Sequence, residues 1–298
     1  MSTTATSLLR PEALAALADL ELVARCAVEG LFQGLHRARR PGFSQEFAEY
    51  RAYSEGDDPR FVDWNVYART GRTYVRRYEG ETNTRLVLAL DASASMGYAS
   101  GGLSKLRYAQ FLLAALAWLA HGQHDPVGLV VFDATLRSYL PPRRRAGSLP
   151  ALLQTLDAVQ PGQHTDVRAA LVPFREHALR RGMVVVASDL YCDAAALLEA
   201  LRPLAAQGHD LLVLQVLDRR ELQPDWTQAV VLRDLETGER REVAPDELAR
   251  DYPARLQAHL SGLQAAVRST GALYQQVATD EPLDLALRRY LALRQRKA

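Results

Sequence analysis

The chain has 298 residues, 48% of them hydrophobic, and a formal net charge of +1 from 36 Lys and Arg against 35 Asp and Glu. This charge balance gives no electrostatic reason to expect nucleic acid or an anionic membrane as a partner, and the apolar content suffices for a sizeable core. Two cysteines, Cys26 and Cys192, are too few for a disulfide framework or a Cys-based zinc site, which fits a reducing compartment.

The N-terminal region predicts a small helical and turn-rich segment over residues 1–84. Apolar residues at helical spacing indicate a helix within residues 11–33. Residues 43–84 predict turns and short strands, and Tyr74–Tyr78 alternates as an edge strand does. The first residues, Met1–Ser7, lack the basic start and apolar core of a signal peptide.

From residue 85 onward the pattern alternates between strands and helices. This alternation predicts an α/β fold with a doubly wound, mostly parallel sheet and helices on both faces. The expected strands cover residues 86–90, 127–132, 135–140, 184–188, 211–217 and 272–276. The expected helices cover residues 104–121, 148–158, 166–180, 194–207, 255–270 and 282–293, and Ser104 is a candidate cap for the first of them.

Two further features of this second domain, residues 85–298, concern membrane spanning and an insertion. Its longest apolar run, Phe111–Ala120, is shorter than the roughly 18–20 residues that a membrane-spanning helix needs, so we expect a cytoplasmic protein without a membrane span. Residues 219–254 interrupt the alternation, and they predict an inserted hairpin and loop.

The most informative motif is Asp91-Ala-Ser93-Ala-Ser95, which directly follows the apolar run Leu86–Leu90. It places one carboxylate and two hydroxyls on a loop where a strand ends. Ligands of open α/β sheets bind at this edge, and hard divalent cations prefer such oxygen donors. The alternative is that the three side chains only satisfy backbone donors in a turn.

This motif resembles the first element of the metal-ion-dependent adhesion site of von Willebrand factor A (vWA) domains. Thr165, at the start of an expected helix, and Asp189, at the end of an expected strand, match the later two elements in the order of that family. The resemblance implies a vWA-like, Rossmann-type fold with direct metal ligation by Ser93 and Ser95. It also implies a direct or water-bridged contact from Thr165, and contacts largely through water from Asp91 and Asp189. Mg²⁺ is the first expectation, with Mn²⁺ or Ca²⁺ as alternatives.

A second motif lies within residues 46–69 and resembles the signature of the DUF58 family, in which it directly precedes a vWA-type domain. The residues that carry this resemblance are Arg51, Tyr53, Gly56, Asp57, Asp58, Arg60, Asp63, Trp64 and Arg69. Their interleaved charges and aromatic rings predict either an ion-paired brace or a docking face, and we favour the brace. The resemblance implies partnership with an AAA+ ATPase of the MoxR type and with a client protein. One departure is Gln163-His164, which stands where the family more often has glycines before the threonine.

Enzyme motifs are incomplete in this sequence. Residues 97–105 are glycine-rich and follow a strand, but Leu103 stands where a P-loop has its lysine, so nucleotide binding is not expected. Asp91 resembles the nucleophile of haloacid-dehalogenase-type phosphatases, but Ser93 replaces their second carboxylate.

Three functions follow from these motifs. The leading hypothesis is a metal-dependent protein-binding module that is not itself an enzyme. The alternatives are a Mg²⁺-dependent phosphatase that uses Asp91 and a metal-free structural scaffold.

Overall fold

The computed structural model describes residues 13, 19–37, 47–52, 62, 66, 73–78, 85–145, 147–162, 164, 180–225 and 227–295. The chain divides into two compact units, one formed by residues 1–31 with residues 84–298 and the other by residues 32–83. The domain boundary near residue 84 that the sequence suggested stays a prediction.

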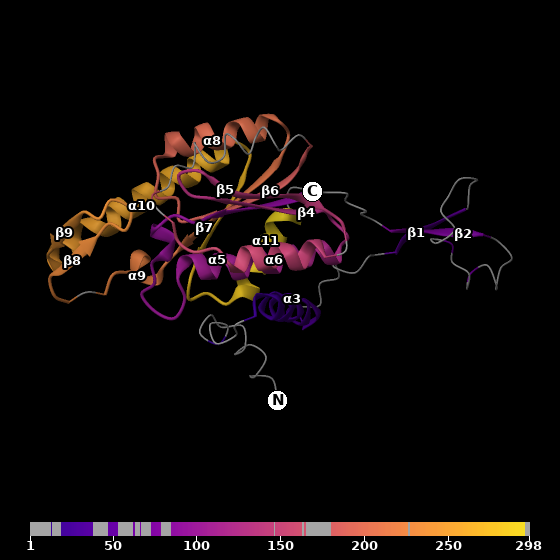
Figure 1. The fold of residues 1–298 in the computed structure, drawn as a ribbon, viewed down its shortest axis with the longest axis horizontal. Helices are drawn as coiled ribbons and strands as arrows, with labels where there is room; N and C mark the ends of the chain where they lie inside the picture. Colours follow the sequence, from indigo (N-terminus) through magenta and orange to yellow (C-terminus); the bar gives the residue numbers. More distant parts are fainter. Residues whose placement is uncertain are drawn as a thin grey trace. The chain divides into compact units, whose positions relative to one another are not determined.

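The larger unit is built around a six-stranded sheet, which confirms the predicted α/β class (Figure 1). The strands are β3 (Arg85–Asp91), β4 (Val127–Phe132), β5 (Leu136–Arg143), β6 (Gly182–Ser188), β7 (Asp210–Leu217) and β10 (Leu273–Ala278). Their order is β10-β7-β6-β3-β4-β5, and all neighbours pair in parallel except β4 and β5. Strands β3, β4 and β6 are apolar on both faces because helices cover both sides.

Helices cover the two faces of this sheet in separate groups (Figure 1). One face carries α8 (Ala194–Ala206) and α10 (Pro245–Ser269), which bury Leu197, Leu201 and Val267 against strand residues such as Val184. The other face carries α5 (Lys105–Gly122), α6 (Ser148–Asp157) and α11 (Leu283–Gln295). Helix α5 is buried almost all round, and the Ser104 hydroxyl accepts a hydrogen bond from the Arg107 amide at its start, which confirms the predicted cap.

The N-terminal helix is present as α3 (Leu20–Arg37), and it buries apolar residues from Leu20 to Leu31. In the smaller unit, β1 (Phe47–Ala52) and β2 (Tyr74–Tyr78) form an antiparallel pair. The expected edge strand over Tyr74–Tyr78 is confirmed. The expected helix over residues 166–180 lies outside the described residues apart from Arg180.

Three expectations about element bounds were wrong. The helix expected within residues 11–33 runs on to Arg37. The strand expected over 135–140 runs to Arg143, and it takes in Pro141 and Pro142 because an edge strand leaves one side of its backbone unpaired. The helix expected over 255–270 begins ten residues earlier, with Pro245 in its first turn. Pro253 and the polar composition hid the first half of this helix, because proline usually ends a helical pattern.

The segment over residues 219–254 contains the expected hairpin and two helical parts. It consists of α9 (Arg219–Leu222), the hairpin β8 (Val230–Arg233) with β9 (Arg240–Val243), and the first half of α10. In the described part of the chain, no helix is both long and apolar enough to cross a membrane.

Candidate functional site

The candidate site lies at the carboxyl edge of the sheet, where β3 and β6 end side by side. The two strands pair in parallel through Leu90 and Ala187, so Asp91 and Asp189 follow at the same edge. Both aspartates are fully buried. The sequence placed them there because parallel strands present their carboxyl ends together.

Asp91 is held by hydrogen bonds on both of its oxygens. Its Oδ1 accepts from the Ser93 amide at 2.9 Å, and its Oδ2 accepts from the Ser188 hydroxyl at 2.6 Å. Burial and the charge of Asp189 raise the pKa of Asp91 to about 7, although the hydrogen bonds from Ser188 and Ser93 oppose this rise. A buried carboxylate in such surroundings is stabilised by any cation that reaches it.

The two serine hydroxyls of the motif converge on each other. Ser93 Oγ and Ser95 Oγ lie 3.1 Å apart and are buried, and Ser95 begins a short 3₁₀ helix over Ser95–Gly97. Their loop is fixed through Ala92, whose amide donates to the Phe132 carbonyl at 2.7 Å and whose carbonyl accepts from the Gly162 amide at 2.6 Å. The motif therefore has a fixed shape, set by the end of β4 and by the loop before residue 165.

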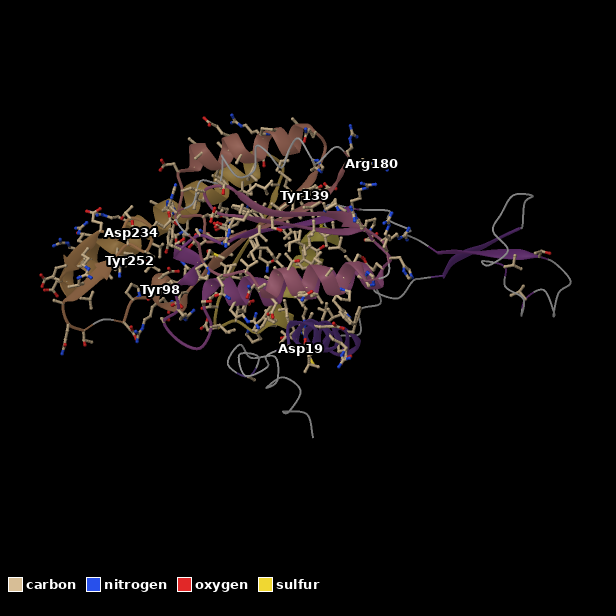
Figure 2. The ribbon with its side chains drawn as sticks, in the orientation of Figure 1. Asp19, Tyr98, Tyr139, Arg180, Asp234 and Tyr252 are labelled. Carbon is tan, nitrogen blue, oxygen red and sulfur yellow. The ribbon has the colours of Figure 1, made fainter. Side chains whose placement is uncertain are left out.

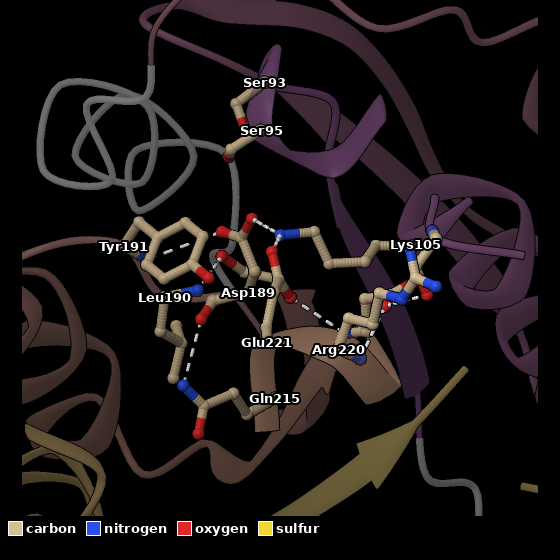
Figure 3. A network of polar contacts seen from close by, with 12 residues as sticks. Ser93, Ser95, Lys105, Asp189, Leu190, Tyr191, Gln215, Arg220 and Glu221 are labelled. Atoms are coloured by element: carbon tan, nitrogen blue, oxygen red, sulfur yellow. Dashed lines mark hydrogen bonds and ion pairs between the residues drawn. The ribbon is translucent and has the colours of Figure 1, made fainter. Parts of the chain in front are cut away.

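Asp189 meets a buried lysine (Figure 3). Lys105 Nζ donates to Asp189 Oδ2 at 2.8 Å and to Glu221 Oε1 at 2.7 Å, and the lysine side chain is 0% exposed. The ammonium also lies 4.5 Å from the centre of the Tyr191 ring and 5.8 Å from that of Tyr98. Burial lowers the pKa of Lys105, but the charges of Asp189 and Glu221 outweigh burial and raise it, so the lysine is charged at neutral pH.

The backbone around Asp189 is also fixed from two sides. The Asp189 carbonyl accepts from Gln215 Nε2 at 2.9 Å, and Gln215 Oε1 in turn accepts from the Tyr274 hydroxyl. The next residue, Leu190, has a positive φ of 58°, and its amide donates to the Ser188 hydroxyl at 2.9 Å. A left-handed leucine is unfavourable by itself, so these contacts hold the turn after β6 in place.

Glu221 connects this site to the inserted segment. Asp218 and Glu221 form a capping box at the start of α9, with Glu221 Oε2 accepting from the Asp218 amide at 2.8 Å. Asp218 also accepts from the Ser100 amide at 2.9 Å, and the Glu221 carbonyl accepts from the Tyr252 hydroxyl of α10 at 2.6 Å. The side chains of Tyr98 and Tyr252 lie near α9 (Figure 2).

The structure places four of the five expected metal-site residues, Asp91, Ser93, Ser95 and Asp189, in buried positions at the same edge of the sheet. Hydrogen bonds join Asp91 to Ser93 and Ser93 to Ser95, and Asp189 is paired with Lys105. Thr165 lies outside the described residues. Sequence reasoning missed Lys105 and Glu221, although the apolar character of α5 gave one signal, because a lysine at the start of a buried helix needs a buried partner.

The family-signature residues fall mostly outside the described part of the chain. Arg51 lies in β1, where its backbone pairs with Val75. The others are Tyr53, Gly56, Asp57, Asp58, Arg60, Asp63, Trp64 and Arg69, and all lie outside the described residues. Whether this segment is a brace or a docking face stays a prediction.

The side chains that could hold a metal ion at this site offer only oxygen atoms. Among the residues that the structure describes, no three His, Cys, Asp or Glu side chains are grouped to hold a metal ion. The oxygens at this edge instead come from a pair of aspartates and a pair of serine hydroxyls. Fold and site together define a doubly wound α/β protein with a buried carboxylate and hydroxyl site at the carboxyl edge of its sheet.

Comparison with known proteins identifies the family. Residues 49–261 match the family described as "Protein of unknown function DUF58". The chain is 31% identical over 293 residues to uncharacterized protein Mb1516 of Mycobacterium bovis and equally to uncharacterized protein Rv1480 of Mycobacterium tuberculosis, covering 97% of this chain and 92% of each relative. The chain therefore belongs to the DUF58 family, which confirms that resemblance.

Two of the solved structures to which the chain is similar come from Bacteroides species. BatB from Bacteroides thetaiotaomicron is 18% identical, with a TM-score of 0.49 over 72% of this chain and 100% of that chain. An aerotolerance-related membrane protein from Bacteroides fragilis is 19% identical, with a TM-score of 0.48 over 69% of this chain and 96% of that chain.

Proposed function

We propose that this chain is a non-enzymatic protein-binding module of the vWA type, whose site takes a divalent cation and through it an acidic residue of a partner. The observation that carries the proposal is the burial of Asp91, Ser93, Ser95 and Asp189 at the ends of the neighbouring parallel strands β3 and β6, with the two serine hydroxyls 3.1 Å apart. Mg²⁺ is the cation we expect first, and Mn²⁺ or Ca²⁺ would suit the same oxygens.

The described residues fit such a cation by the chemistry of their donors. Ser93 and Ser95 would hold it directly, because their hydroxyl oxygens already lie 3.1 Å apart on a fixed loop. Asp91 and Asp189 would position the cation and balance its charge, and Thr165 would complete the set of oxygen ligands. When bound, the cation would supply an open coordination position for a carboxylate of another protein.

The surroundings of Asp91 support binding over phosphoryl transfer. A phosphoryl-accepting carboxylate has to reach its substrate with a free oxygen. Each oxygen of Asp91 already accepts a hydrogen bond, one from the Ser93 amide and one from the Ser188 hydroxyl. These contacts favour a structural and electrostatic role for this side chain.

The partner we propose is an AAA+ ATPase of the MoxR type, acting with this chain on a client protein in the cytoplasm. Membership of DUF58 supports this proposal through the association that the family resemblance implies. As a contact point without chemistry of its own, the proposed site would make the module an adaptor for the ATPase.

Thermal unfolding with and without metal tests the site. A ligand that binds only the folded state raises its stability by mass action, about 2.7 kcal/mol when the ligand is at 100 times its Kd. We expect millimolar Mn²⁺ or Mg²⁺ to raise the melting temperature of the wild type above its value in EDTA. Ser95→Ala removes one donor and should lose this shift.

Ser148→Ala is the matched control, because Ser148 begins α6 and its hydroxyl makes one long contact, 3.4 Å from the Arg143 carbonyl. The control should keep the wild-type shift. A wild type whose melting temperature is the same in metal and EDTA would leave only the scaffold function. For the partner, we expect a purified MoxR-type ATPase to bind the wild type in Mg²⁺ and to release it in EDTA.

A further inference from the structure

Lys105 is a buried cation beside the candidate metal site. Its ammonium contacts Asp189 at 2.8 Å and Glu221 at 2.7 Å without any exposure to solvent. An ion pair of this kind loses the hydration of all its members, so its presence is weak evidence for a purely stabilising role. A more specific role for Lys105 is needed.

The charges at this edge suggest that role. Asp189 and Glu221 contact the one ammonium, and Asp91 lies at the same edge of the sheet. A bound cation would keep Asp91 ionised, and the three carboxylates and the ammonium would then carry a net charge of minus two. A divalent cation would bring the cluster to neutrality. If the lysine were absent, the site with its bound cation would have a net charge of minus one, and a further carboxylate would be repelled.

We propose that Lys105 sets the charge of the candidate site, lowering its affinity for a divalent cation and thereby keeping the bound cation attractive to a carboxylate from a partner. This inference rests on the proposed function and deepens it. Lys105 acts through Asp189, so it is a positioning residue rather than a metal ligand. The partner chemistry that follows is an acidic side chain, because a site that the cation has brought to neutrality does not repel a carboxylate.

Glu221 allows the inference to be tested in the opposite direction. It contacts the same ammonium from α9 and is 15% exposed in its side chain. Glu221→Gln removes one negative charge and leaves Lys105 in place, whereas Lys105→Met removes one positive charge and leaves both carboxylates. Lys105→Arg keeps the charge and changes the shape of the contact.

The measurement is the affinity of the 298-residue chain for Mn²⁺, determined by titration calorimetry at low ionic strength. We expect Lys105→Met to bind Mn²⁺ about tenfold more tightly than wild type and Glu221→Gln about tenfold more weakly, a factor that corresponds to roughly 1.4 kcal/mol in each direction. Lys105→Arg should stay within about threefold of wild type, since it preserves the charge. Raising the salt concentration should shrink these differences little, because buried charges are weakly screened.

The outcomes separate this inference from the proposed function. A brace without an electrostatic role would weaken Mn²⁺ binding in both Lys105→Met and Glu221→Gln, since both loosen the site, and that result would overturn the inference alone. Wild-type protein that binds no Mn²⁺ would overturn the proposed function and the inference together. If Lys105→Met does not fold, as judged by near-ultraviolet circular dichroism, the comparison of Glu221→Gln with Lys105→Arg tests the inference. Weaker Mn²⁺ binding by Glu221→Gln alone supports it, and equal Mn²⁺ affinities of the two variants would overturn it.

Discussion

Replacing Lys105 with methionine should destabilise the metal-free protein more than any exposed charge substitution. Methionine is close to lysine in length and keeps the apolar contacts of its stem, so the change removes the ammonium and little else. The substitution leaves Asp189 and Glu221, which are 1% and 15% exposed in their side chains, without their shared cation.

The magnitude follows from the geometry of the two contacts. At 2.8 and 2.7 Å, each contact is worth about 6 kcal/mol of gross Coulomb energy at an effective dielectric constant of about 20. The desolvation of the three groups cancels much of this gain, and removing one partner of a buried pair costs about 3–5 kcal/mol in net stability. For a chain of this size, that loss lowers the melting temperature by about 5–8 °C.

Urea unfolding and thermal unfolding in EDTA measure this loss without interference from bound metal. Arg107→Met is the control on the same helix, because its 2.6 Å ion pair with Asp157 is 27% and 43% exposed. An exposed pair of this kind contributes about 0–1 kcal/mol. A loss below about 1 kcal/mol for Lys105→Met, equal to that of the control, would refute the view that the buried ammonium stabilises this edge of the sheet.

Three further outcomes are expected. A Cβ at Gly162 would lie 2.4 Å from Asp133 Oδ2 and 3.1 Å from the Ala92 carbonyl, so Gly162→Ala should cost about 1–3 kcal/mol in urea unfolding and weaken Mn²⁺ binding, whereas Gly101→Ala, with open space around it, should do neither. Hydrogen bonds from the Glu236 and Thr237 amides lower the pKa of Asp234 in the β8–β9 turn. The contribution of Asp234 to the stability of the hairpin is therefore present at neutral pH and lost as pH falls through the lowered pKa. Asp234→Ala should speed amide exchange across residues 230–243, and Asp234→Asn, which keeps an acceptor, should speed it less. Burial and the nearby charge of Asp91 raise the pKa of Cys192 to about 12, so its alkylation by iodoacetamide, followed by mass spectrometry, should keep accelerating above pH 9, and a plateau at pH 9 would contradict this.

The fold was predictable because its strongest signals are local. Continuous apolar runs such as Leu86–Leu90 occur where strands are buried on both faces, and their alternation with helices leaves few topologies. The errors fall where a local rule is weakest. Pro253 lies inside α10, and the antiparallel edge strand β5 takes in prolines that a central strand would exclude.

The part of the site that follows strand ends was predictable for a related reason. Asp91 and Asp189 each follow a buried strand, and parallel strands end at one edge, so strand assignment alone brings them together. Lys105 and Glu221 lie at helix starts instead. Lys105 is the first residue of α5, and Glu221 lies in the first turn of α9. Where a helix start lies relative to a distant strand end depends on loop length and packing, and neither can be read from residue type.

The incomplete P-loop pattern over residues 97–105 shows how the position of Lys105 determines which charge the loop attracts. In a P-loop, a lysine at the start of the helix faces the anion that the loop binds. Here Lys105 stands two positions later than that lysine would, and its ammonium faces carboxylates that belong to the chain itself. A loop whose lysine is already neutralised by Asp189 and Glu221 has no charge left for a phosphate. It does leave Ser93 and Ser95 with two oxygens and a nearby excess of negative charge, and such surroundings attract a cation rather than an anion.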